Sequence, residues 1–156
     1  MKSRKRSAAN SKPPDPPVFF LDRSLGTGAV AAALRAAGHR VVVHDEEFPQ
    51  DALDGEWLPL VGERGWVVLT KDRQIRTRKN EIAALIQARV AAFVITRADL
   101  TGPEMAKALV AALPAMLRAL AKRARPFVAK VTTAGAVEML ALPARETKGF
   151  VDRRSG

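Results

Sequence analysis

Short apolar runs alternate with helix-like segments along the central part of the chain. Four runs rich in β-branched and aromatic residues occupy residues 18–21, 40–44, 66–69 and 91–96. Runs as short and continuous as these are typical of strands buried on both faces, as in a parallel sheet. Segments that favour helix separate them, at residues 29–37, 53–64 and 81–89. The alternation predicts an α/β fold of three layers, with a mostly parallel central sheet flanked by helices.

A longer helix and a final pair of strands are predicted towards the C-terminus. Thr101 and Glu104 have the spacing of a capping box, so a helix should begin there. Apolar residues then recur at helical spacing, and Pro114 is expected to kink the helix. Residues 127–132 and 136–142 suggest a closing strand or hairpin around Gly135.

The ends of the chain differ in composition from its centre. Residues 1–17 are rich in Lys, Arg and Ser and then in Pro, which predicts a disordered arm. Residues 18–142 form the predicted domain, because 156 residues suffice for one core and not for two. Residues 143–156 are expected to be a tail. The formal net charge of +10 indicates attraction to nucleic acid, although much of this charge lies in the two ends.

Other features narrow the class of protein. The chain contains no cysteine, which excludes disulfides, thiolate metal sites and a cysteine nucleophile. No apolar run approaches the roughly 20 residues of a membrane helix, and the basic N-terminus lacks the apolar stretch of a secretory signal. A cytoplasmic location is therefore expected.

Two aspartates follow predicted strands directly. Asp22 comes after the first strand, and Asp72 lies just past the third. The carboxyl ends of parallel strands meet at one edge of a sheet, where the functional crevice of such folds lies. Two carboxylates at this edge suit a hard cation such as Mg²⁺ or Mn²⁺. The alternative is structural, since Asp22 could start a turn and Asp72 could cap the next helix.

A third carboxylate is placed by helical spacing. If residues 53–64 are helical, Asp54 falls within the apolar arc that includes Trp57 and Leu58. A carboxylate that points towards a core is costly unless it is paired or bound to metal. Asp54 is therefore the predicted third ligand, and Glu56, on the flank of the arc, a weaker fourth. Alternatively, Asp54 is a first-turn acid that favours the helix dipole.

Polar and basic residues surround the third strand end. Thr70 precedes Asp72 by two residues, so both point to the same side of an extended segment. Its hydroxyl could orient a carboxylate or a metal-bound water, or could satisfy local backbone. A basic cluster beside a carboxylate site suits a phosphodiester substrate, and the candidate RNA-binding residues are Arg73, Arg76, Arg78 and Lys79.

Three motifs together resemble the PIN-like domain family. They are the strand ending in Asp22 (Phe-Phe-Leu-Asp-Arg-Ser-Leu-Gly), the Asp-Gly-Glu-Trp that starts at Asp54, and the strand before Thr-Lys-Asp at residues 70–72. The resemblance covers about residues 18–140 and is nearest to VapC-type toxins of toxin–antitoxin pairs. It implies a metal-dependent endoribonuclease that uses Mg²⁺ or Mn²⁺, an acidic antitoxin partner encoded nearby, and a possible homodimer.

One position departs from the pattern of the family. Many PIN-like domains have a further acid two residues after the third aspartate, where this chain has Gln74. Glu56 or Glu81 could compensate, the site could hold a single metal, or the chain could be a PIN-like binding module without catalysis. A phosphotransfer domain of the haloacid-dehalogenase type is a further alternative, but such domains usually need an acid at the position of Ser24.

Overall fold

A computed structural model describes residues 16–25, 28–49, 54–72, 79–97 and 99–142, with the side chains of residues 23, 54–56 and 79–81 left out. The predicted arm at residues 1–15 and the predicted tail at residues 143–156 lie outside the described residues.

The described residues form one six-stranded sheet with the strand order β2-β1-β3-β4-β5-β6. All neighbouring strands are parallel except β5 and β6, which form an antiparallel hairpin. The predicted α/β class with a mostly parallel sheet is thus confirmed. The strands are β1 (Val18–Leu21), β2 (Arg40–Val43), β3 (Val67–Thr70), β4 (Ala91–Ile95), β5 (Phe127–Val131) and β6 (Val137–Leu140).

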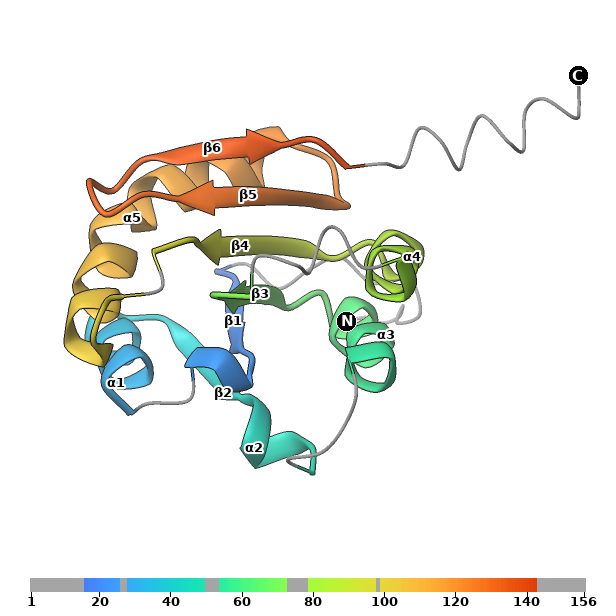
Figure 1. Ribbon diagram of the computed structural model, residues 1–156, viewed down its shortest axis with the longest axis horizontal. Helices are drawn as coiled ribbons and strands as arrows, with labels where there is room; N and C mark the ends of the chain where they lie inside the picture. The colour runs from blue at the N-terminus through green and yellow to red at the C-terminus, as the bar shows by residue number, and fades with distance from the viewer. Residues whose placement is uncertain (1–15, 26–27, 50–53, 73–78, 98, 143–156) are drawn as a thin grey trace, which may run out of the picture.

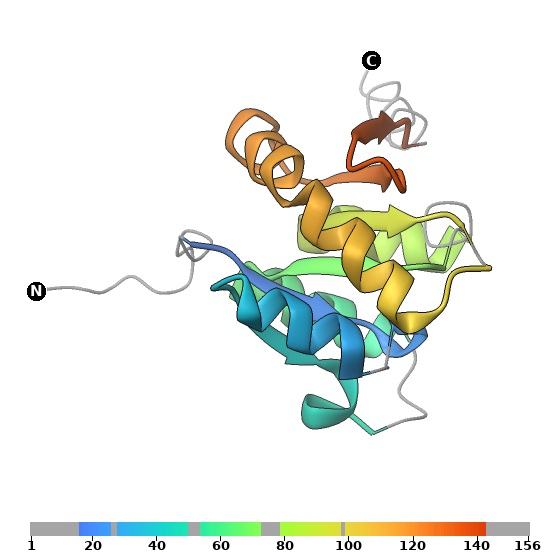
Figure 2. The same ribbon diagram turned by 90° about the vertical axis from the view of Figure 1, so that its left-hand side faces the viewer.

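Helices cover both faces of the sheet and complete the three layers (Figure 1). Helices α1 (Gly28–Ala36) and α5 (Gly102–Lys122) pack together on one face, which is turned to the viewer in Figure 2. Helices α3 (Asp54–Arg64) and α4 (Lys79–Ala88) pack together on the other face. We call the edge at which the parallel strands end the carboxyl edge, and the opposite one the amino edge.

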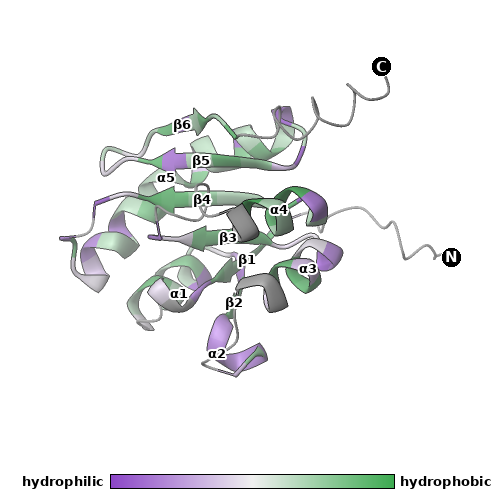
Figure 3. Ribbon diagram, turned by 45° about the vertical axis from the view of Figure 1, so that its right-hand side comes forward, coloured by the Kyte–Doolittle hydropathy of each residue, from purple (hydrophilic) through white to green (hydrophobic). Residues whose placement is uncertain are grey.

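Alternation along each strand builds two apolar cores. In β1, Phe19 and Leu21 join the core beneath α1 and α5, whereas Phe20 joins the core beneath α3 and α4. All four residues of β1 are buried because both faces of the sheet are covered. This explains why the strands read as continuous apolar runs rather than as alternating ones, and Figure 3 shows their hydrophobic colour across the centre.

The segment after β2 differs from the prediction. Residues 40–44 were expected as a strand, but the strand ends at Val43 and His44–Glu47 form the short helix α2. The Glu46 carboxylate accepts a hydrogen bond from the Val43 backbone N–H at 3.3 Å, which caps this helix. His44 is fully buried, and its ring lies against Phe20 and Phe48.

Helix α5 begins as its sequence predicts. Glu104 donates its backbone N–H to the Thr101 hydroxyl at 3.2 Å, and Thr101 donates its own to the Glu104 carboxylate at 2.8 Å. This reciprocal pair is the predicted capping box. The helix is continuous through Pro114. Among the described helices, none combines the length and the apolarity needed to cross a membrane.

Candidate active site

Asp22 lies at the carboxyl edge, directly after the central strand β1. Its backbone N–H donates to the Leu69 carbonyl at 3.1 Å, which continues the pairing of β1 with β3 by one residue. The residue is only 7% exposed, although it carries a carboxylate. A buried carboxylate is costly unless hydrogen bonds or a cation compensate for the lost water. The hydrogen bonds of the Asp22 carboxylate therefore matter for its role.

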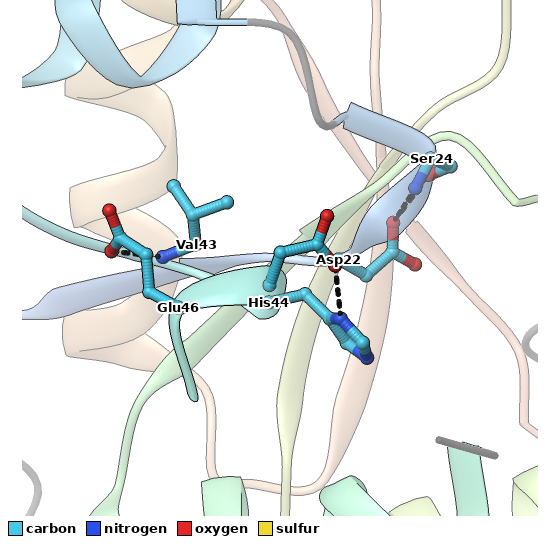
Figure 4. Close-up of polar contacts among 6 residues, drawn as sticks. Asp22, Ser24, Val43, His44 and Glu46 are labelled. Atoms are coloured by element: carbon cyan, nitrogen blue, oxygen red, sulfur yellow. Dashed lines mark hydrogen bonds and ion pairs between the residues drawn. The ribbon is translucent and has the colours of Figure 1, made fainter. Parts of the chain in front are cut away.

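Two hydroxyl side chains set the direction of the Asp22 carboxylate. Its Oδ1 accepts from the Ser24 backbone N–H at 2.8 Å and from the Ser24 hydroxyl at 2.5 Å (Figure 4). Its Oδ2 accepts from the Thr70 hydroxyl at 2.5 Å, and Thr70 itself is fully buried. Hydrogen bonds from three donors stabilise the charged form and leave the carboxylate little freedom to rotate.

The same hydroxyls tie Asp22 to the end of β3. Ser24 Oγ accepts from the Lys71 backbone N–H at 3.0 Å, and Thr70 Oγ1 accepts from the Asp72 backbone N–H at 3.0 Å. Ser24 Oγ and Thr70 Oγ1 lie 3.1 Å apart. One buried hydroxyl, that of Thr70, thus joins the carboxylate of Asp22 to the backbone of Asp72. The structure brings these two predicted site residues to the same edge, with Thr70 as the orienting residue between them.

Ser24 is a partner of Asp22 that the sequence analysis did not predict. The signal was present in the spacing, because an Asp side chain commonly accepts the backbone N–H two residues later and forms an Asx-turn. In the structure, Ser24 lies in a single 3₁₀ turn, Arg23–Leu25, that directly follows Asp22. The turn brings both donors of Ser24 onto one carboxylate oxygen.

The start of helix α3 is brought to the same edge by the topology. The helix ends at Arg64, just before β3, so its 11 residues return the chain from the carboxyl edge to the amino edge over about 16 Å. Asp54 is its first residue, and Glu56 lies in its first turn. Trp57 and Leu58 are buried, as the predicted apolar arc requires. The side chains of Asp54 and Glu56 themselves lie outside the described residues.

The rest of the predicted site falls on residues that are not described. These residues are Arg73, Arg76 and Arg78, together with Gln74; Lys79 begins α4, but its side chain is not described. Among the side chains that the structure does describe, no three His, Asp or Glu lie together in a group able to hold a metal ion. Asp22 and Asp72 are the predicted ligands whose side chains the structure describes at the carboxyl edge.

Beyond the end of β4, Arg97 and Asp99 form a two-point ion pair. Arg97 Nε and Nη2 donate to the two carboxylate oxygens of Asp99 at 2.9 and 3.0 Å. These hydrogen bonds from Arg97 hold the pKa of Asp99 below its usual value, and the pKa of Arg97 is raised in turn. Both side chains are exposed, so this pair is an electrostatic feature of the protein surface.

Comparisons with known proteins agree with this geometry. The family model described as a PIN like domain matches residues 17–97, which include β1, α3, β3 and β4. The chain is also 32% identical over 126 residues to the protein named "Putative ribonuclease VapC45" from Mycobacterium tuberculosis, an alignment that covers 78% of this chain and 91% of the relative. No solved structure gives a significant match. The chain belongs to the PIN-like domain family.

Proposed function

We propose that the chain is a ribonuclease that hydrolyses RNA phosphodiester bonds with Mg²⁺ or Mn²⁺ at the carboxyl edge. The observation that carries this proposal is the Asp22 carboxylate, which is buried at the end of β1 and held by Ser24 and Thr70. The relative from Mycobacterium tuberculosis that is named as a ribonuclease supports the class of reaction.

The donor set at this edge fits a hard divalent cation. Asp22 and Asp72 supply carboxylate oxygens at the ends of neighbouring strands, which is the ligand type that Mg²⁺ and Mn²⁺ prefer. We assign Asp54 as the third ligand and Glu56 as a weaker fourth, because α3 begins at the same edge and Asp54 precedes the buried Trp57 and Leu58 by one turn. The pairing of Asp22 with Thr70 hydroxyl supports a positioned rather than a solvated carboxylate.

The proposed site residues have distinct roles. A divalent ion held by Asp22, Asp54 and Asp72 would supply an activated water and would stabilise negative charge on the phosphate. Thr70 and Ser24 keep the Asp22 carboxylate in one orientation, so that no reorganisation is needed when substrate binds. The RNA backbone is bound beside the site by Arg73, Arg76, Arg78 and Lys79. Contacts with phosphates carry no sequence information, so these residues position the RNA and do not select its sequence.

The proposal is tested by cleavage of a mixture of structured and single-stranded RNA. The purified chain is assayed with Mg²⁺, with Mn²⁺ and with EDTA, alongside Asp22→Asn and Asp72→Asn variants whose folding is checked by circular dichroism. Asp99→Asn is the matched control, because Asp99 is an exposed aspartate paired with Arg97. We expect cleavage only with metal, loss of cleavage in both site variants, and full activity in the control.

The same assay separates the nuclease from a PIN-like binding module without catalysis. If RNA is bound and stays intact under every metal condition, the catalytic proposal is wrong and the binding module is the better description. The absence of the usual further acid at Gln74 is the sequence feature that motivates this comparison.

We also propose an acidic antitoxin partner, so that the chain is the toxin of a toxin–antitoxin pair in the cytoplasm. The similarity to the VapC45 protein and the net charge of +10 support this proposal. Co-expression with the product of the neighbouring gene should give a complex in which RNA cleavage is suppressed. Light scattering of the chain alone would show whether it forms the homodimer that the family resemblance implies. Cleavage that continues undiminished in the presence of the neighbouring product would contradict the antitoxin assignment.

A further inference from the structure

Basic residues precede the parallel strands at the amino edge, opposite the candidate active site. Arg40 begins β2, Arg64 precedes β3 and Arg89 precedes β4. Three more basic residues lie between α5 and β5 or at the end of α5. Because the strand order is β2-β1-β3-β4-β5, these residues are spread across the sheet. We call this set the amino-edge row; its members are Arg40, Arg64, Arg89, Lys122, Arg123 and Arg125.

Most of the row is exposed and lacks acidic neighbours. Arg40, Arg89, Lys122 and Arg123 are exposed, and none of the four forms an ion pair with another described residue. One described acid pairs with a member of the row, and two more lie close to that pair in space or in sequence. Glu47 pairs with Arg64 at 3.2 Å, Glu46 approaches the nearby Arg35 at 3.8 Å, and Glu63 is exposed next to Arg64. The row therefore keeps an excess of positive charge.

Arg125 and Arg64 give the row fixed points. The Arg125 guanidinium donates to the Gly65 carbonyl at 3.0 Å, so it reaches from the start of β5 to the turn before β3. The Arg64 guanidinium lies 4.9 Å from the centre of the Trp66 ring. Both contacts anchor arginines to the backbone or to the core, which reduces the entropy that these side chains lose when they bind an anion.

The described part of the chain begins and ends at this same edge. Strand β1 starts at the amino edge, and residues 1–15 precede the described residues in sequence. Strand β6 is antiparallel, and Leu140 pairs with Val128 near the start of β5, so β6 ends at this edge (Figure 1); residues 143–156 follow in sequence. These segments contain nine Lys and Arg, namely Lys2, Arg4, Lys5, Arg6, Lys12, Arg145, Lys148, Arg153 and Arg154.

We propose that the amino-edge row is a second RNA-binding surface, which holds the phosphate backbone of RNA outside the portion that is cleaved. The inference rests on the proposed function for the identity of the polyanion. The strands are four or five residues long, so the two edges lie about 15 Å apart. An RNA of several tens of nucleotides is therefore long enough to contact both edges at once.

The test is a binding measurement that does not depend on cleavage. Fluorescence anisotropy is recorded in EDTA with a long unstructured RNA, of about 30 nucleotides, over a series of salt concentrations. The test variant carries Arg40→Gln and Arg123→Gln, two exposed members of the row. The matched control carries Lys107→Gln and Lys130→Gln, which remove the same charge from α5 and from the β5–β6 hairpin. Thermal unfolding by circular dichroism confirms that both variants are folded.

For the row variant, we expect a loss of RNA affinity that depends on the salt concentration. Each lost phosphate contact lowers the slope of log affinity against log salt by about 0.7 for single strands, so two contacts lower it by about 1.4. If affinities converge near 1 M salt, the long RNA should bind about 25-fold more weakly at 0.1 M salt. We expect the control to match the wild type.

Three results would overturn this inference. The first is an unchanged salt slope for the long RNA in the row variant, and the second is an equal loss of affinity in the control variant. The third comes from a parallel measurement with polyglutamate: a row variant that still binds RNA but no longer binds polyglutamate would assign the row to an acidic protein. The outcome is separate from that of the proposed function. If RNA is bound through the row but is never cleaved, the second binding surface is supported and the ribonuclease is contradicted. If RNA is cleaved and the row variant binds RNA as the wild type does, the ribonuclease is supported and the second binding surface is contradicted.

Discussion

The hydroxyl of Thr70 should contribute measurably to stability, because it is the link between Asp22 and the end of β3. The substitution Thr70→Val keeps the shape of a fully buried side chain and removes the hydroxyl alone. Asp22 Oδ2 then loses its donor, and the Asp72 N–H loses its acceptor. A hydrogen bond to a charged group contributes about 1.5–3 kcal/mol, and a part-buried N–H left without a partner adds about 1 kcal/mol.

The expected destabilisation is thus about 2–4 kcal/mol, which lowers the Tm by roughly 8–16 °C for a domain of this size. The Tm is followed by circular dichroism at neutral pH, together with the rate of RNA cleavage. The rate should fall by about 100-fold, because a small misplacement of a catalytic group has an effect of this order. Thr70→Ser keeps the hydroxyl and should restore most of both properties.

Thr132→Val provides the matched comparison. Its hydroxyl accepts a single exposed bond, from the Ala136 N–H at 3.0 Å, so its removal should destabilise the protein by about 1 kcal/mol or less. A Thr70→Val protein with the Tm of the wild type, or a Thr132→Val protein that loses as much, would refute the hydrogen-bond network around Asp22.

Two further predictions concern helix packing and pH. Gly62→Ala places a Cβ 2.3 Å from the Ala88 carbonyl oxygen, so α3 and α4 must separate, and denaturant unfolding should show a stability lower by about 1–3 kcal/mol or more. The control, Gly28→Ala, meets nothing within 4 Å and should be neutral or slightly stabilising. Equal effects of the two substitutions would contradict this packing. Because Arg97 lowers the pKa of Asp99, the pair stabilises the fold above pH about 3.9, and this contribution is lost as the pH falls through the lowered pKa. NMR titration should show the pKa of Asp99 rising in Arg97→Gln, and an unchanged pKa would contradict the ion pair.

Most of the fold follows from the hydrophobic pattern, because both faces of the sheet are covered. The continuous apolar runs marked the strands, and the capping box at Thr101 marked the start of α5. The segment at His44–Glu47 was less predictable. His44 was predicted as the last residue of a strand. The short helix forms because the buried His44 packs against aromatic rings from distant segments, which is a tertiary effect that the local sequence does not contain.

The candidate site was predictable in part. The positions of Asp22 and Asp72 follow from strand ends that meet at one edge, and the role of Thr70 follows from its spacing to Asp72. The hydrogen bond between Thr70 and Asp22 joins residues 48 positions apart. It forms only because β1 and β3 are neighbours in the sheet. The catalytic and metal-binding roles of Asp22, Asp72 and Thr70 stay predictions. The same holds for Asp54, Glu56 and the basic cluster that starts at Arg73, whose side chains are not described.

The most direct test of the central claim is the rate of RNA cleavage as a function of Mn²⁺ concentration, for the wild type and for folded Asp22→Asn protein. The metal-dependent mechanism predicts that wild-type cleavage is absent in EDTA and rises to saturation with Mn²⁺, while Asp22→Asn stays inactive at every concentration. Equal rates for the two proteins, or wild-type cleavage that persists in EDTA, would contradict a metal held by Asp22.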